Sequence, residues 1–238
     1  KYEDIIVYQG DTDTTPFDGA THASRGLYGA GQPVVKCAEK LHNLLLEWSA
    51  RIFKCGPEDL EIKDSKVYIH DKPEESIPVS EVVCAAHYRG WGIASAQASV
   101  RPNACPPHFI TVFVEVEVDT LTGMVNITNA LSGVDTGTII NLNNVEGQVT
   151  GGFHMGMGYA LMEDTIIDGK GQLRTKNFSR YHIPTVMDMP DVDMIFADTY
   201  EPTGPLGAKA IGEGVTNPVA AAIGNAINNA VGIRIRNL

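Results

Sequence analysis

The chain has 238 residues, 43% of them apolar and 20% charged, a length and composition that suit a folded protein with a substantial core. Its formal net charge of −11 excludes nucleic acid and acidic lipid as partners, because both require a basic surface. The sequence contains no apolar run near the roughly 20 residues that cross a bilayer, so we expect a cytoplasmic protein with no membrane partner. Small molecules and other proteins remain as partners.

The first residues indicate whether the chain is a fragment, and the cysteines indicate whether it binds metal or forms disulfides. It opens at Lys1 without an initiator methionine and passes at once into a β-rich run, so we expect a fragment or one piece of a split polypeptide. The four cysteines are widely spaced and form no CxxC pair, which argues against a zinc site, an iron–sulfur cluster or a disulfide framework. We therefore expect free thiols.

The first part of the chain predicts a strand, a loop and a small-residue segment. Residues 5–8 favour a strand, and residues 9–16 are rich in turn formers. Residues 21–32 are mostly small, and Ser24 can cap the helix expected after them. Backbone N–H groups beside such a helix start are open to an anionic ligand, although close packing against a neighbouring helix is the simpler explanation for glycines alone.

Apolar spacing predicts a scaffold after this segment. An amphipathic helix is expected over residues 34–53, with Trp48 in the core. A strand pair over residues 60–70 and a short helix over residues 79–88 come next. None of these elements carries a pattern that indicates chemistry.

The second half predicts a sheet. Residues 109–118 alternate between apolar and polar side chains and form, with residues 124–131, a predicted β-hairpin, and a further strand is expected at residues 192–199. Because no repeat or low-complexity linker is present, we expect one interlocked α+β unit, with residues 1–104 and 105–238 as its natural subdivisions.

Residues 145–158 have the spacing of a helix but are rich in glycine. Each glycine destabilises an exposed helix interior by roughly 1 kcal/mol, so this segment requires close contact with another element or with a ligand. Gln148 offers a donor group and an acceptor to such a ligand. The glycines are at positions 147, 151, 152, 156 and 158.

A third glycine-rich segment, residues 204–218, surrounds one carboxylate. Asn217 and Pro218 predict an N-cap and a first helical residue, so Glu213 is expected on a tight loop beside the positive end of a helix. A carboxylate in that position suits a general base, or it only complements the helix dipole. The residues themselves leave these two interpretations evenly matched.

These glycine-rich segments share one composition: small residues, one or two polar side chains and a helix start. Together they resemble the C-terminal part of the molybdenum-binding subunit of the xanthine dehydrogenase and aldehyde oxidase family, the molybdenum hydroxylases. The layout is similar to the medium molybdopterin subunits of nicotinate dehydrogenases. The resemblance spans nearly the whole chain in the right order, through Gln9-Gly10-Asp11-Thr12, Ala23-Ser24, Gly31-Gln32-Pro33-Val34 and residues 115–123, 145–152, 181–184 and 207–213.

The resemblance implies an α+β molybdopterin-binding domain with mixed sheets and packed helices. It implies that Glu213 is the general base of a hydroxylation of an N-heterocycle or an aldehyde, with water as the oxygen source. Gln148 matches a glutamine that hydrogen-bonds the pyranopterin. The family has Glu-Pro-Pro or Glu-Pro-Ala at the catalytic carboxylate, whereas Gly214 and Val215 stand at those positions here, a departure that would loosen the loop.

The segment around Ser24 matches the family's small-residue loop at the cofactor. Ala23 and Ser24 are its counterparts, and Gly26 and Leu27 come next on the same loop. Family members often carry serine or threonine at these last two positions, so cofactor contacts there would come from the backbone. His22 stands where the family often has a small residue close to the substrate, and we expect it to help select the substrate.

The resemblance also implies cofactors and partners. The cofactor is molybdopterin with molybdenum, favoured as the cytosine dinucleotide, while iron–sulfur centres and FAD belong to partner subunits. The other half of the molybdenum subunit is missing from this sequence, so the isolated chain is expected to be inactive outside a hetero-oligomer. The alternative is a non-catalytic assembly subunit or degenerate relative, in which the glycines serve packing only. In the enzymatic case, the Glu213 carboxylate is expected to face a hollow floored by turns near Ser24 and Gln148.

Overall fold

The structure is a computed structural model that describes residues 2–19, 21–70 and 72–237. The chain divides into two compact units, one of residues 1–20 and 29–102 and the other of residues 21–28 and 103–238. Within the described ranges, no helix is both long enough and apolar enough to cross a membrane. Helices and two three-stranded sheets in these ranges confirm the predicted α+β class with mixed sheets.

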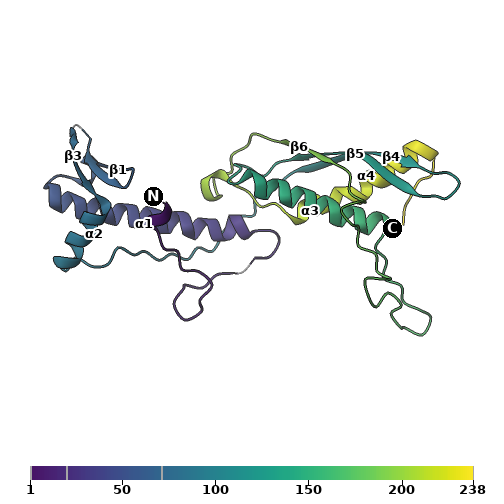
Figure 1. The fold of residues 1–238 in the computed structure, drawn as a ribbon, viewed down its shortest axis with the longest axis horizontal. Helices are drawn as coiled ribbons and strands as arrows, with labels where there is room; N and C mark the ends of the chain where they lie inside the picture. Colours follow the sequence, from purple (N-terminus) through teal and green to yellow (C-terminus); the bar gives the residue numbers. More distant parts are fainter. Residues whose placement is uncertain (1, 20, 71, 238) are drawn as a thin grey trace. The chain divides into compact units, whose positions relative to one another are not determined.

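The first unit packs helices against an antiparallel sheet of order β1-β2-β3 (Figure 1). The predicted strand pair is confirmed, and a third strand that sequence reasoning missed extends it. Trp48 is 2% exposed in the core of this unit, as predicted. The elements are η1 (Tyr2–Asp4), α1 (Gly26–Phe53, whose residues 26–28 belong to the second unit), η2 (Pro57–Asp59), β1 (Leu60–Lys63), β2 (Lys66–Ile69), β3 (Lys72–Pro78) and α2 (Val79–Tyr88).

Two expectations for the N-terminal residues are wrong. Residues 5–8 form no strand and are exposed, since β-propensity yields a strand only where a partner strand is available to pair with it. The small-residue segment is also shorter than expected, because α1 begins at Gly26 and includes Pro33. The first turn of this helix is held by Tyr28, which is 4% exposed and whose hydroxyl lies 2.8 Å from Thr203 Oγ1.

The second unit is built on a sheet of order β4-β5-β6. The predicted hairpin is confirmed as β4 (Ile110–Val118) and β5 (Val125–Val134), which pair antiparallel. A bulge at Thr128 breaks the alternation of β5, so that Ile127 and Ala130 both face the core. Strand β6 (Val192–Phe196) lies parallel to β5, which requires the long crossover connection that the helix α3 provides.

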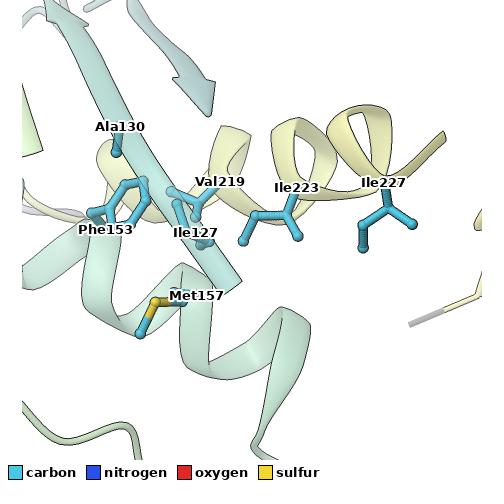
Figure 2. Packing of buried hydrophobic residues seen from close by; sticks show 7 residues of the cluster. All are labelled: Ile127, Ala130, Phe153, Met157, Val219, Ile223 and Ile227. Atoms are coloured by element: carbon cyan, nitrogen blue, oxygen red, sulfur yellow. The ribbon is translucent and has the colours of Figure 1, made fainter. Parts of the chain in front are cut away.

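Two helices cover one face of this sheet (Figure 1). Helix α3 (Leu142–Leu161) begins at Asn141, whose side chain accepts a 3.1 Å hydrogen bond from Asn144 N. Helix α4 (Glu213–Val231) comes after the short helix η3 (Pro205–Gly207) and contacts α3 and β4. Figure 2 shows the core between them, formed by Ile127, Ala130, Phe153, Met157, Val219, Ile223 and Ile227.

Helix α3 meets α4 through two of its glycines. A Cβ atom built on Gly152 would lie 2.6 Å from Val215 Cβ, and one built on Gly156 would lie 2.5 Å from Val219 Cβ and 2.9 Å from Thr216 O. Real Cβ atoms do not approach so closely, so these two positions require glycine. The close contact expected for this segment is therefore a helix–helix contact at Gly152 and Gly156.

We predict that Gly156→Ala lowers the free energy of unfolding by about 1–3 kcal/mol, because the new methyl group overpacks the α3–α4 contact. Gly151→Ala is the matched control on the same helix, since nothing lies within 4 Å of a Cβ built there. Higher helix propensity should leave this control unchanged or more stable by up to about 1 kcal/mol. Urea unfolding measures both, and equal effects would contradict the packing role.

Candidate functional site

The second unit brings the turn at residues 21–25 against the start of α4. Ser24 Oγ lies 3.0 Å from Glu213 Oε2 and donates a hydrogen bond to it. The backbone N–H of Glu213 donates a 2.8 Å hydrogen bond back to Ser24 Oγ. Residues that are 189 positions apart in the chain are thus joined by two hydrogen bonds.

Helix α4 starts earlier than the sequence predicts. Glu213 is its first residue, and the predicted cap and first residue, Asn217 and Pro218, lie inside the helix. Gly212 occupies the N-cap position with φ +126° and has no side chain with which to cap. Ser24 supplies the missing acceptor from the other segment, so it caps α4 and not the next helix in sequence.

Gln148 reaches the same place from α3. Its side chain is exposed, and its Oε1 would lie 3.2 Å from a Cβ built on Gly212, which also would lie 2.9 Å from Ser24 Oγ. Positive φ and this crowding both restrict position 212 to glycine. Ser24, Gln148 and Glu213, which the sequence placed in three separate segments, therefore meet around Gly212.

The other predicted residues of the turn lie beside this group without a described contact to Glu213. Ala23 and Ser24 both have left-handed backbone, with φ of +50° and +57°. His22 is exposed, and its carbonyl accepts a hydrogen bond from Arg25 N. Gly26 and Leu27 were predicted to lie on the same loop as Ser24. This prediction is wrong, because both residues belong to the first turn of α1.

The carboxylate lies at an open surface, beside the two residues, Ser24 and Gln148, that were expected to floor a hollow. Glu213 and Gln148 are exposed, and Ser24 is half-buried. The surface hollow near the start of α4 is lined by other residues: His108, Phe109, Ile110, Gly214, Asn217 and Pro218. Within this unit, one side of the group is therefore open.

The residue that departs from the family motif after the carboxylate, Gly214, lies close to His108. Gly214 lies in the first turn of α4, and a side chain there would collide with the His108 ring. Glycine therefore fits this position, and Glu213 stands in a helical turn. The segment expected as a loop is thus the first turn of α4, while its loosening stays a prediction.

A buried ion pair that sequence reasoning missed holds the segment before Glu213. Lys209 Nζ lies 2.7 Å from Asp135 Oδ2, and their side chains are only 10% and 11% exposed. Thr199 donates a 2.6 Å hydrogen bond to Asp135 Oδ1, and Gly137 N donates one of 3.3 Å. Burial opposes ionisation of this carboxyl, but the hydrogen bonds from Lys209, Thr199 and Gly137 and the charge of Lys209 lower the pKa of Asp135.

Backbone hydrogen bonds extend this anchor along both segments. Lys209 N donates to Thr136 O at 2.9 Å, and Thr138 N donates to Gly207 O at 2.9 Å. One signal was present in the sequence: Lys209 is a single cation in a run of small apolar residues, directly upstream of Glu213. A cation that becomes buried in such a run requires an anionic partner.

The group offers hydrogen bonds to an organic ligand. Its donors and acceptors are a carboxamide, a hydroxyl and a carboxylate at an open surface. On α3, Gly147 and Gly151 flank Gln148, and nothing lies within 4 Å of a Cβ built on either. A flat polar ligand can approach the helix backbone closely at these two glycines. These residues thus fit a pterin-type cofactor, and the carboxylate can accept a proton at its edge.

Comparison with known proteins gives one family model, described as a molybdopterin cofactor-binding domain, which matches residues 1–190. The chain is 35% identical over 238 residues to the xanthine dehydrogenase molybdenum-binding subunit of Escherichia coli O157:H7. The aligned residues cover 98% of this chain and 32% of that protein. The chain thus spans about a third of the length of this curated relative.

Solved structures share the fold. Quinoline 2-oxidoreductase from Pseudomonas putida 86 superposes with a TM-score of 0.81 and 30% identity over 89% of this chain and 28% of that one. Reconstituted CO dehydrogenase from Oligotropha carboxidovorans superposes with a TM-score of 0.87 and 25% identity over 97% of this chain and 29% of that one.

We predict that the Asp135–Lys209 pair makes stability depend on pH. Because the pKa of Asp135 is lower in the folded chain than in the unfolded one, its contribution is complete above the ordinary carboxyl pKa of about 3.9 and is lost as pH falls through the lower folded value. Urea unfolding between pH 7 and pH 3 should show a smaller loss on acidification in Asp135→Asn than in the original chain. The exposed carboxylate of Asp193 provides the control, Asp193→Asn, which should keep the original slope.

Proposed function

The chain belongs to the molybdopterin cofactor-binding domain family of the molybdenum hydroxylases, and we propose that it forms the C-terminal part of a molybdenum-binding subunit that hydroxylates an N-heterocycle or an aldehyde. The meeting of Ser24, Gln148 and Glu213 around Gly212 carries this proposal. Quinoline and xanthine, which appear in the names of the relatives, are both N-heterocycles, and this favours that substrate class.

In this proposal Glu213 is the general base. The bound cofactor supplies the redox chemistry and the site where water is activated. Ser24 donates a hydrogen bond to Oε2 of the carboxylate, which leaves Oε1 open to accept the proton. Glu213 is the first residue of α4, so its carboxylate stands at the end of the helix where the dipole is positive.

The cofactor would be held by residues on both sides of Glu213. Gln148 would donate from its carboxamide to the pyranopterin, and Gly147 and Gly151 would admit the ligand to the backbone of α3. Ala23, Gly26 and Leu27 would contribute backbone groups from the turn and from the first turn of α1. All of these residues except the half-buried Gly26 are exposed, which supports this assignment.

The complete enzyme would contain further parts. We infer a cytosine dinucleotide form of the cofactor, iron–sulfur and flavin partner subunits, and the other half of the molybdenum subunit. The length of the relative, about three times that of this chain, supports the last of these. The chain alone would then be inactive, and residues 1–104 and 105–238 would act as parts of one cofactor-binding domain.

The alternative is a non-catalytic subunit that keeps the fold. The contact of Gly152 and Gly156 with α4 favours it, because those two glycines serve packing only. Gly147 and Gly151 have no such contact. Gly158 is also packed, against Glu163 and Pro184, so packing accounts for three of the five glycines and the enzymatic proposal for Gly147 and Gly151.

We predict that Glu213→Gln, in the complete enzyme, lowers kcat by roughly 10²–10⁴-fold, the contribution of a positioned general base. The amide keeps the size of the side chain but cannot take the proton. Molybdenum content should equal that of the original enzyme. Glu117→Gln, an exposed carboxylate on β4, is the control and should keep full turnover. Full turnover in Glu213→Gln would show that Glu213 is not the general base, and the alternative of a non-catalytic subunit would remain for this chain.

We predict that His22→Ala changes the substrate profile and not the metal content. A contact with the substrate typically discriminates between substrates by about 10–200-fold, so the ratio of kcat/KM between two N-heterocycles of different size should shift within that range. His87→Ala, an exposed histidine on α2, should leave the ratio unchanged. An unchanged ratio in His22→Ala would remove this residue from the substrate site.

A further inference from the structure

We propose that Ser24 is a positioning residue for Glu213: its side chain holds the carboxylate in one orientation while it caps helix α4. This inference rests on the proposed function, in which Glu213 is the general base. It assigns the Ser24 hydroxyl to the carboxylate, and any contact of Ser24 with the cofactor then comes from its backbone.

The two hydrogen bonds fix the direction of the hydroxyl proton. A serine hydroxyl has one proton and two lone pairs. The backbone N–H of Glu213 can only donate, so Ser24 Oγ is the acceptor of that 2.8 Å bond. The hydroxyl proton is then free for Glu213 Oε2 at 3.0 Å. With the hydroxyl proton donated to Oε2, Oε1 is the oxygen left open to take up a proton.

The backbone of the turn is shaped for this contact. Ser24 and the residue before it have positive φ, +57° and +50°, a conformation that is unfavourable for residues other than glycine. Such strain persists where the surrounding structure requires it, and it is frequent at functional sites. Here the turn carries the hydroxyl to the N–H and the carboxylate of one residue.

The glycine at position 212 makes Ser24 necessary as the cap of α4. Gly212 is the N-cap of α4 but has no side chain, and a side chain there would meet Ser24 Oγ at 2.9 Å and Gln148 Oε1 at 3.2 Å. A local cap is therefore excluded by the same crowding that brings the three side chains together. The cap comes from Ser24, and the orientation of the carboxylate comes with it.

A plain helix cap and a positioning residue differ in what they do to turnover. A cap alone stabilises α4, and its loss would affect folding but not the chemical step specifically. A positioning residue lowers kcat when it is removed, with little change in KM, and only while Glu213 is the base.

The test uses the complete enzyme with Ser24→Ala, Glu213→Gln and both together. We expect Ser24→Ala to lower kcat by roughly 10–100-fold, with KM changed by less than about threefold and molybdenum content unchanged. In the Glu213→Gln background, Ser24→Ala should change kcat by less than about twofold, because its target is gone. Equal factors in both backgrounds, or unchanged kcat in Ser24→Ala, would overturn the inference, as would loss of molybdenum with native exchange at Glu213.

Hydrogen exchange provides a readout that does not depend on turnover. In Ser24→Ala, the amide of Glu213 should exchange about fivefold faster or more, the effect of losing a helix cap. Ser99→Ala is the matched control, since it removes a hydroxyl that bonds a backbone carbonyl, Phe17 O, at 2.8 Å in the other unit. If Glu213→Gln kept full turnover, the general-base proposal would fail, while exchange would still decide whether Ser24 holds this residue.

Discussion

The close approach of α3 and α4 is the constraint on which the rest of the second unit depends. Val215 and Val219 lie where side chains on Gly152 and Gly156 would be, so the two helix backbones come into direct contact. Gln148 is one turn before Gly152 on α3, and Glu213 is two residues before Val215 on α4. The distance between the two helices therefore sets the distance between the carboxamide and the carboxylate. A larger residue at either glycine would separate the helices and, with them, the polar group at their ends.

Three further contacts fix the segments that meet this helix pair, and each acts on a different piece of backbone. The buried Asp135–Lys209 pair ties the segment before Glu213 to the end of β5. The Tyr28 hydroxyl meets Thr203 and so holds the first turn of α1 to the same connection. Ser24 completes the arrangement at the start of α4. These contacts hold the backbone of Glu213 in place, although its carboxylate lies at an open surface.

The sequence predicts the elements whose signal is local. The alternating strands β4 and β5, the apolar stripe of α1 and the glycine-rich helix α3 are all present in the structure. The start of α4 could not be predicted, because its cap is 189 residues away in the chain, and the usual signal, Asn217 before Pro218, lies inside the helix. Residues 5–8 show the converse, since their strand propensity is strong but they form no strand in the described part of the chain. Sequence patterns likewise indicated no partner for Lys209, because an ion pair between distant segments leaves no spacing to detect.

The glycines of α3 look alike in the sequence, but in the structure some contact α4 and others face open space. A glycine inside a helix costs roughly 1 kcal/mol relative to alanine, so each position requires a compensating contact. At Gly152 and Gly156 the compensation is the contact with α4. At Gly147 and Gly151 nothing lies within 4 Å of the missing Cβ. A fold kept only for assembly would need the first pair but gains nothing from the second. In the proposed function, a ligand that reaches the backbone of α3 close to Gln148 would account for the open pair.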